Sequence, residues 1–198
     1  MLANDMSNDG GAREFQPPAR PEEGAGRVSV FLAGSIEQGK ATEWQREVVK
    51  EVEELPVDVF NPRRKHWEPG QEQRATNPYF YEQVTWEQDL MEQADIVAMY
   101  FDPKTKAPIS LLELGYWCAA RPEKLLVCCS KGFWRFGNVE MMQLRHEFER
   151  VDTFDEFLRR LRERVAKAGD ERGCGQRGTG GAAEDVRDCS PSLFRNCP

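Results

Sequence analysis

The chain lacks the features of a membrane or exported protein. No apolar stretch among its 198 residues approaches the roughly 20 that a transmembrane helix requires. Residues 1–23 are polar and contain Pro and Gly, which is unlike a signal peptide. We therefore expect a cytoplasmic protein with no membrane partner.

The chain is also poor in metal ligands, with only two His. Cys128 and Cys129 are adjacent at the end of an apolar run, and Cys118 lies in a helix-like segment, so these three are predicted to be buried free thiols. The other three Cys are irregularly spaced within a Gly-rich segment and do not form the paired pattern of a zinc site. We predict no metal site and no cofactor.

Blocks of one charge sign are absent as well. The net charge is −7, and acidic and basic residues are interleaved, so the chain has no footprint for a nucleic acid polymer. A content of 39% hydrophobic and 31% charged residues suffices for one domain with a core. We expect that domain at 27–167, between disordered tails at 1–26 and 168–198 that are rich in Gly, Pro and polar residues.

Within the domain the apolar pattern alternates between two periods. Short apolar runs predict strands, and apolar residues at helical spacing predict helices. Strands are predicted at 28–33, 57–60, 95–101, 124–129 and 147–151, and helices at 41–55, 77–94, 111–120 and 154–165. Asn77 and Pro78 are typical of an N-cap and a first helical residue. Such alternation predicts an α/β fold with an open parallel sheet and helices on both faces.

Residues 111–116, Leu-Leu-Glu-Leu-Gly-Tyr, place a single carboxylate in an apolar run. Packing of this segment would partly desolvate Glu113, which raises a carboxyl pKa and costs free energy. A catalytic role would explain that cost. An ordinary exposed Glu on an amphipathic helix fits the same residues.

Ligands of an open parallel sheet collect at the carboxyl ends of its strands. The first predicted strand runs into Gly34 and Ser35, small residues that either admit a ligand or form a tight turn. The second is followed by Asn61, Arg63 and Arg64, whose guanidinium groups either bind an anion such as phosphate or form a solvated loop.

The third predicted strand is followed by Asp102, whereas Asp95 begins it at the opposite edge and is discounted as catalytic. Aromatic side chains near the carboxyl rim could stack on a flat ring or pack in the core. They are Trp67, Tyr79, Tyr81, Trp86 and Tyr116.

Four segments occur in an order that resembles the nucleoside 2-deoxyribosyltransferase family. They are Val-Phe-Leu-Ala-Gly at 30–34, Trp-Glu-Gln-Asp-Leu at 86–90, Ala-Asp-Ile-Val at 94–97 and Leu-Glu-Leu-Gly-Tyr at 112–116. The resemblance spans about residues 28–150 and implies a flavodoxin-like fold. It places Glu113 on the family's nucleophile toward the anomeric carbon and Asp89 near the departing base. Asn138 matches an Asn that a neighbouring subunit contributes, which implies a homo-oligomer.

Two positions depart from the family pattern. Phe31 stands where members often have a Tyr that contacts the nucleophile, and Phe cannot donate that hydrogen bond. Many transferases carry an Asp a few residues before the Glu, whereas this chain has Ala-Pro-Ile-Ser at 107–110. With Ser110, that segment resembles the corresponding segment of relatives that hydrolyse nucleoside monophosphates.

The resemblance implies cleavage of a (deoxy)nucleoside or nucleotide N-glycosidic bond and transfer of the sugar to another nucleobase. Alternatives are a hydrolase of nucleoside 5′-monophosphates and a non-catalytic nucleotide-binding module. A flavodoxin-like electron carrier is disfavoured, because Glu37 follows the first strand in place of a Ser/Thr-rich phosphate loop.

Overall fold

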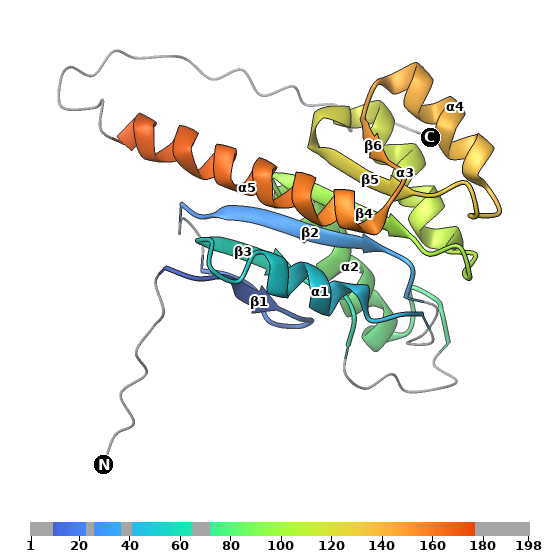
Figure 1. The fold of residues 1–198 in the computed structure, drawn as a ribbon. Coiled ribbons are helices and arrows are strands. Elements are labelled where there is room, and N and C mark those ends of the chain that lie inside the picture. Colours follow the sequence, from blue (N-terminus) through green and yellow to red (C-terminus); the bar gives the residue numbers. More distant parts are fainter. Residues whose placement is uncertain (1–9, 23–25, 37–40, 65–71, 177–198) are drawn as a thin grey trace, which may run out of the picture.

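A computed structural model describes residues 10–22, 26–36, 41–64 and 72–176 (Figure 1). It contains six strands and five α-helices with one 3₁₀ turn, η2, in these parts of the chain. In chain order they are β1 (Arg13–Phe15), β2 (Val28–Gly34), α1 (Trp44–Glu51), β3 (Val57–Phe60), α2 (Pro78–Gln93), β4 (Ile96–Phe101), α3 (Pro108–Ala120), η2 (Pro122–Lys124), β5 (Leu125–Cys129), α4 (Phe136–His146), β6 (Glu149–Val151) and α5 (Phe154–Gln176).

The strands form one parallel sheet in the order β1-β3-β2-β4-β5-β6. The chain moves from β2 to β3 on one side and then crosses to β4 on the other, so the strand order reverses beside β2. This is the flavodoxin-like α/β architecture that the sequence predicts. The position outside the carboxyl ends of β2 and β4 is the topological switch point, where such folds bind ligands.

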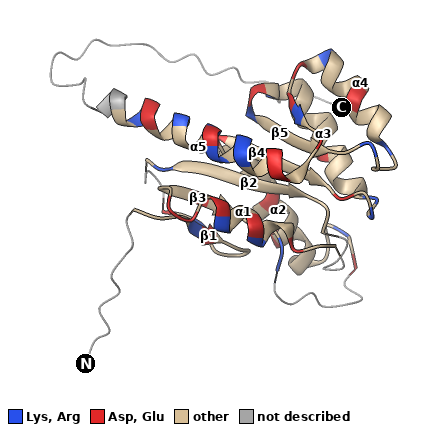
Figure 2. Ribbon diagram, viewed as in Figure 1, with Lys and Arg blue, Asp and Glu red and all other residues tan. Residues whose placement is uncertain are grey.

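Helices cover both faces of the sheet (Figure 1). One apolar core joins α1 and α5 to the sheet through Trp44, Val48, Phe157 and Leu161. The other joins α2, α3 and α4 to the opposite face, and its side chains include Trp86, Leu90, Leu114, Trp117 and Val139. Helices α1 and α5 both contain residues of each charge sign (Figure 2).

The helix ends follow local chemistry. The side chain of Asn77 accepts a hydrogen bond from the backbone N–H of Tyr79 at 3.1 Å, and Pro78 is the first residue of α2, as predicted. Helix α1 ends at Glu51, earlier than the predicted end at residue 55, and Pro56 disfavours helical backbone only at Leu55. Helix α3 begins at Pro108, which suits a first helical position.

The N-terminal region differs from the expected tail at 1–26. Strand β1 pairs in parallel with β3, so these residues form an edge of the sheet. Three residues are too few to show an apolar period, and β1 is stabilised by long-range partners: Arg13 donates two hydrogen bonds of 2.8 Å to the carboxylate of Asp58. Residues 1–9 and 23–25 lie outside the described part of the chain.

The C-terminal helix is longer than predicted. Helix α5 continues through the expected boundary at 167 to Gln176, and Arg172 pairs with Asp95 at 2.5 Å. Asp95 also accepts hydrogen bonds of 2.8 Å from both the N–H and the hydroxyl of Ser29. The carboxylate of Asp95 therefore links the amino ends of the strands to α5. Of the tail expected at 168–198, the structure describes only the part that belongs to α5, as far as Gln176.

Three cysteines, Cys118, Cys128 and Cys129, are buried free thiols, as predicted. Burial raises the pKa of Cys128 and of Cys129 to about 12, so both thiols stay protonated near neutral pH. Within the described ranges, no group of three or more His, Cys, Asp and Glu side chains could hold a metal ion. None of the helices described is both long enough and apolar enough to cross a membrane.

Candidate active site

The turn after β2 is built around Gly34. Its φ is +136°, and a Cβ at this position would lie 2.2 Å from the backbone oxygen of Tyr100. Only glycine allows this approach of β2 to β4. The neighbouring Ser35 is fully buried, and its hydroxyl accepts a hydrogen bond from the N–H of Asp102 at 3.0 Å and shares one with the hydroxyl of Thr105 at 2.6 Å. The turn therefore binds the loop after β4 rather than presenting Ser35 to solvent.

The loop after β4 is held in the same way. The carboxylate of Asp102 accepts hydrogen bonds from the hydroxyl of Thr42 at 3.1 Å and from the N–H of Lys104 at 2.9 Å. The hydroxyl of Ser110, in the first turn of α3, donates to the carbonyl of Gly34 at 2.9 Å. These contacts place the start of α3 directly beside the end of β2.

The residues after β3 contact the protein itself. Asn61 donates to the carboxylate of Glu14 at 2.6 Å and accepts from the N–H of Arg63 at 3.0 Å. The guanidinium of Arg63 donates to the carbonyls of Ala41 and Thr42, both at 3.0 Å. Arg63 therefore links the loop after β3 to the residues that precede α1.

Arg64 begins a polar chain that crosses α2. Its Nε donates to the side-chain oxygen of Gln83, its Nη2 pairs with Glu82 at 3.0 Å, and its guanidinium lies over the Tyr79 ring with 4.4 Å to the centroid. The amide nitrogen of Gln83 donates to the carbonyl of Pro62 at 3.1 Å and to Oε1 of Glu87 at 2.7 Å. Arg64, Gln83 and Glu87 form one hydrogen-bonded series.

Glu113, in the second turn of α3, interacts electrostatically with Glu87. Burial raises the pKa of Glu113 to about 8, and the negative charge of Glu87 contributes in the same direction. Burial also raises the pKa of Glu87, against the hydrogen bond from Gln83 and the positive charge of Arg64. Two such carboxyl groups are not both ionised at low cost, so near neutral pH the pair holds a proton.

Sequence reasoning missed Glu87. The signal is present in the sequence: Gln83, Glu87 and Leu90 recur at the spacing of one helix face, and Gln83 and Leu90 are buried. An acidic residue on the helix face that packs toward the sheet is desolvated, as Glu113 is, and is a candidate catalytic residue for the same reason. Glu87 and Glu113 are 26 positions apart in the chain, so the sequence alone does not show that they form a pair.

Phe31 and Trp86 pack against each other in the core on the sheet face that α2 and α3 cover. Each is 1% exposed, and their ring centroids are 6.1 Å apart. The indole N–H of Trp86 donates to the carbonyl of Ala19 at 2.8 Å. Both aromatic rings belong to the core. Of the two roles that the sequence leaves open for Trp86, stacking on a ligand ring or packing in the core, the structure shows packing in the core.

Asp89, Tyr116 and Asn138, which the sequence also predicts for the site, are partly or fully exposed. Asp89 pairs with Arg20 at 2.8 Å, and both side chains are roughly half-exposed. Tyr116 is exposed and packs edge-on against Trp117, with 5.2 Å between the ring centroids. Asn138 is exposed at a hollow between α3 and α4. Trp67 lies outside the described residues.

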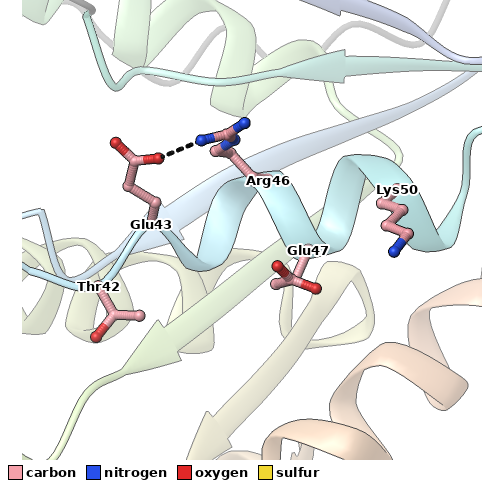
Figure 3. Close-up of a pocket in the computed structure, with 5 residues that line it drawn as sticks. All are labelled: Thr42, Glu43, Arg46, Glu47 and Lys50. Atoms are coloured by element: carbon pink, nitrogen blue, oxygen red, sulfur yellow. Dashed lines mark hydrogen bonds and ion pairs between the residues drawn. The ribbon is translucent and has the colours of Figure 1, made fainter.

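Two surface hollows do not include Glu113. One lies along α1 and the two residues before it, where Glu43 and Arg46 point toward each other and pair at 3.1 Å (Figure 3). Its lining consists only of polar and charged side chains. The other, which contains Asn138, is lined mainly by apolar residues of α3 and α4, including Leu111, Leu114, Val139 and Met142.

The structure thus brings Glu113 together with a second carboxylate on the sheet face that α2 and α3 cover. No curated protein matches the chain. A family model described as nucleoside 2-deoxyribosyltransferase like matches residues 27–133, which is more than half of the chain and includes β2 through β5. The chain therefore belongs to the nucleoside 2-deoxyribosyltransferase-like family.

Proposed function

We propose that this protein cleaves the N-glycosidic bond of a (deoxy)nucleoside or nucleotide through a glycosyl ester on Glu113 and transfers the 2-deoxyribosyl group to another nucleobase. The observation that carries the proposal is the half-buried Glu113 on α3, the helix that follows β4, whose desolvated carboxyl group interacts with that of Glu87. A fold has little structural reason to desolvate two interacting carboxyl groups, whereas a catalytic site does.

The chemistry follows from the charge that develops on the sugar. Substitution at an anomeric carbon passes through an oxocarbenium-like transition state, which a carboxylate stabilises. An oxygen of Glu113 bonds to C1′ while the bond from C1′ to the base nitrogen breaks, and its electron pair stays on that nitrogen. The acceptor nitrogen of a second base then attacks C1′ and releases the Glu113 carboxylate. Two displacements retain the configuration at C1′.

Water as the acceptor would make the protein a hydrolase, and Ser110 favours this second candidate through its similarity to relatives that hydrolyse nucleoside monophosphates. Its position in the first turn of α3, beside the end of β2, suits a residue near the sugar. A non-catalytic binding module would bind nucleotide without cleaving it.

We also propose a homo-oligomer in which a neighbouring copy supplies Asn138. On α3, the side chains of Ile109, Leu112 and Tyr116 are exposed at helical spacing, and on α4 the side chains of Met141 and Leu144 are exposed. An apolar stripe of this kind is typical of an interface. Mixing inactive Glu113→Gln with inactive Asn138→Ala should restore activity if sites form between copies.

The central test is chromatography of the purified protein incubated with deoxynucleosides or their monophosphates, with and without a second free base. We expect a new nucleoside only when the second base is present, and none with Glu113→Gln. Free base and free sugar without an acceptor would identify the hydrolase. Equal base release by Glu113→Gln and the parent would contradict the role of Glu113.

A further inference from the structure

We infer that the sugar donor is a nucleoside di- or triphosphate, whose outer phosphates bind a basic rim on the loops that follow β4 and β5. The inference rests on the proposed function, because it names the substrate class of that same site. The basic rim consists of four exposed side chains, those of Lys104, Lys106, Lys131 and Arg135.

The two loops of the basic rim leave the sheet side by side. Phe101 and Cys129, the last residues of β4 and β5, are paired in the parallel sheet. Further along the loops, a Cβ added at Gly132 would lie 3.4 Å from the Cβ of Pro103. Lys131 and Lys104, the neighbours of these two residues in the chain, therefore lie on adjoining loops at the carboxyl edge of the sheet.

Aromatic side chains hold the two loops together. The ring of Phe133 is buried against that of Phe101, with 5.0 Å between the centroids. The indole N–H of Trp134 donates to the carbonyl of Lys106 at 3.0 Å. The guanidinium of Arg135 lies over the same indole, 4.3 Å from the ring centroid. A guanidinium stacked in this way loses less conformational freedom when its N–H groups bind phosphate oxygens.

The charge of the basic rim opposes that of the whole chain. The net charge is −7, yet the segments 103–112 and 130–139 contain four Lys and Arg and no Asp or Glu (Figure 2). Asp102 precedes the first segment, but its buried carboxylate accepts from Thr42 and from the N–H of Lys104. Gathered cations repel one another, and a ligand with several anionic groups offsets that repulsion.

The distance from Glu113 favours a phosphate chain over a single phosphate. Glu113 lies in the second turn of α3, about 7.5 Å along the helix axis from Pro108 at 1.5 Å per residue. Lys104 and Lys106 lie beyond that first residue. A 5′-phosphate stays next to a sugar bound at Glu113, whereas the β- and γ-phosphates extend away from the sugar and can span this separation.

Binding of inorganic tripolyphosphate tests the basic rim without any turnover. Isothermal titration calorimetry should show that the parent binds tripolyphosphate more tightly than orthophosphate. Combining Lys104→Ala with Arg135→Ala should weaken tripolyphosphate binding about 10-fold or more, because two charge-assisted contacts are lost. Lys50→Ala, which removes an exposed lysine of α1, is the matched control and should bind as the parent does.

Kinetics with two donors of the same base test the substrate class. The KM of the parent should be about 10-fold or more lower for the deoxynucleoside triphosphate than for the deoxynucleoside. In the double variant the KM of the triphosphate should rise to about that of the nucleoside, with kcat changed little, since the phosphates bind equally in the ground and transition states. The KM of the nucleoside should change far less.

The outcomes separate this inference from the proposed function. Equal tripolyphosphate affinities of parent and double variant would overturn the inference, and base release from nucleosides would still support the proposed function. Tighter binding of a single-stranded oligodeoxynucleotide than of tripolyphosphate would also overturn the inference, because the ligand would then be a polymer. A parent that binds tripolyphosphate through these residues but releases base from neither donor would overturn the proposed function and leave the basic rim as a phosphate site.

Discussion

The indole N–H of Trp86 donates a 2.8 Å hydrogen bond to the backbone carbonyl of Ala19, which joins α2 to the N-terminal segment. One turn further along α2, Asp89 pairs with Arg20 of the same segment. Trp86 precedes Glu87 and packs against Phe31. The segment at 10–22 is therefore part of the structure that positions the candidate site.

Deletion of residues 1–22 should lower the melting temperature. It removes β1 from the edge of the sheet and the acceptor of the buried Trp86 indole, and a buried donor without a partner costs about 1–3 kcal/mol. Each 1 kcal/mol corresponds to about 2–4 °C in a domain of this size. Thermal unfolding followed by circular dichroism measures the effect.

Arg20→Ala is the matched control for that deletion. It removes only a half-exposed ion pair, which contributes about 0–1 kcal/mol, so its melting temperature should stay close to the parent's. A deletion variant that unfolds at the parent's temperature would show that the segment contributes nothing.

Glu113→Gln should become more stable than the parent as pH rises. The pKa of Glu113 is raised in the folded state to about 8, so between its unfolded value and about pH 8 the folded state binds more protons than the unfolded state. The parent therefore loses stability as pH increases through this window, whereas the amide has no proton to lose. Melting temperatures of both proteins from pH 5 to pH 9 measure the difference. A constant difference across this range would mean that Glu113 titrates normally.

Gly34→Ala should destabilise the fold strongly. The added Cβ would lie 2.2 Å from the Tyr100 oxygen, and the φ of +136° is unfavourable for any side chain. Gly115→Ala is the control, because nothing lies within 4 Å of its added Cβ and the position is inside α3. Alanine there should raise stability by about 0.5–1 kcal/mol. Urea unfolding of both variants tests the contrast, and equal effects would contradict the close approach of β2 to β4.

Arg63→Ala should act on stability rather than on phosphate binding. Its guanidinium donates to the carbonyls of Ala41 and Thr42, so the variant should unfold at a lower temperature. The KM values for a nucleoside and for its monophosphate should change by the same factor. A rise confined to the monophosphate would instead identify Arg63 as a phosphate ligand, one of the two interpretations that the sequence leaves open.

Much of the fold could be predicted because its signals are local. Apolar period, the Asn77 cap and Pro78 identify elements from neighbouring residues alone, and strands alternating with helices lead to a parallel sheet. Strand β1 could not be predicted, because its evidence is a pairing with β3 more than forty residues away. The end of α5 was missed for the same reason, since Arg172 is held by Asp95.

For the site, the sequence by itself determined that Glu113 is a carboxylate in an apolar run, and that its motif resembles a nucleoside-processing family. Tertiary structure alone decided which charges surround it. The resemblance assigned Asp89 to the leaving base, and the folded chain pairs Asp89 with Arg20. Glu87, two residues before it on α2, points in a different direction, accepts a hydrogen bond from Gln83, and its charge acts on Glu113. The pKa of a carboxyl group depends on burial and on nearby charge, and both are properties of the folded chain.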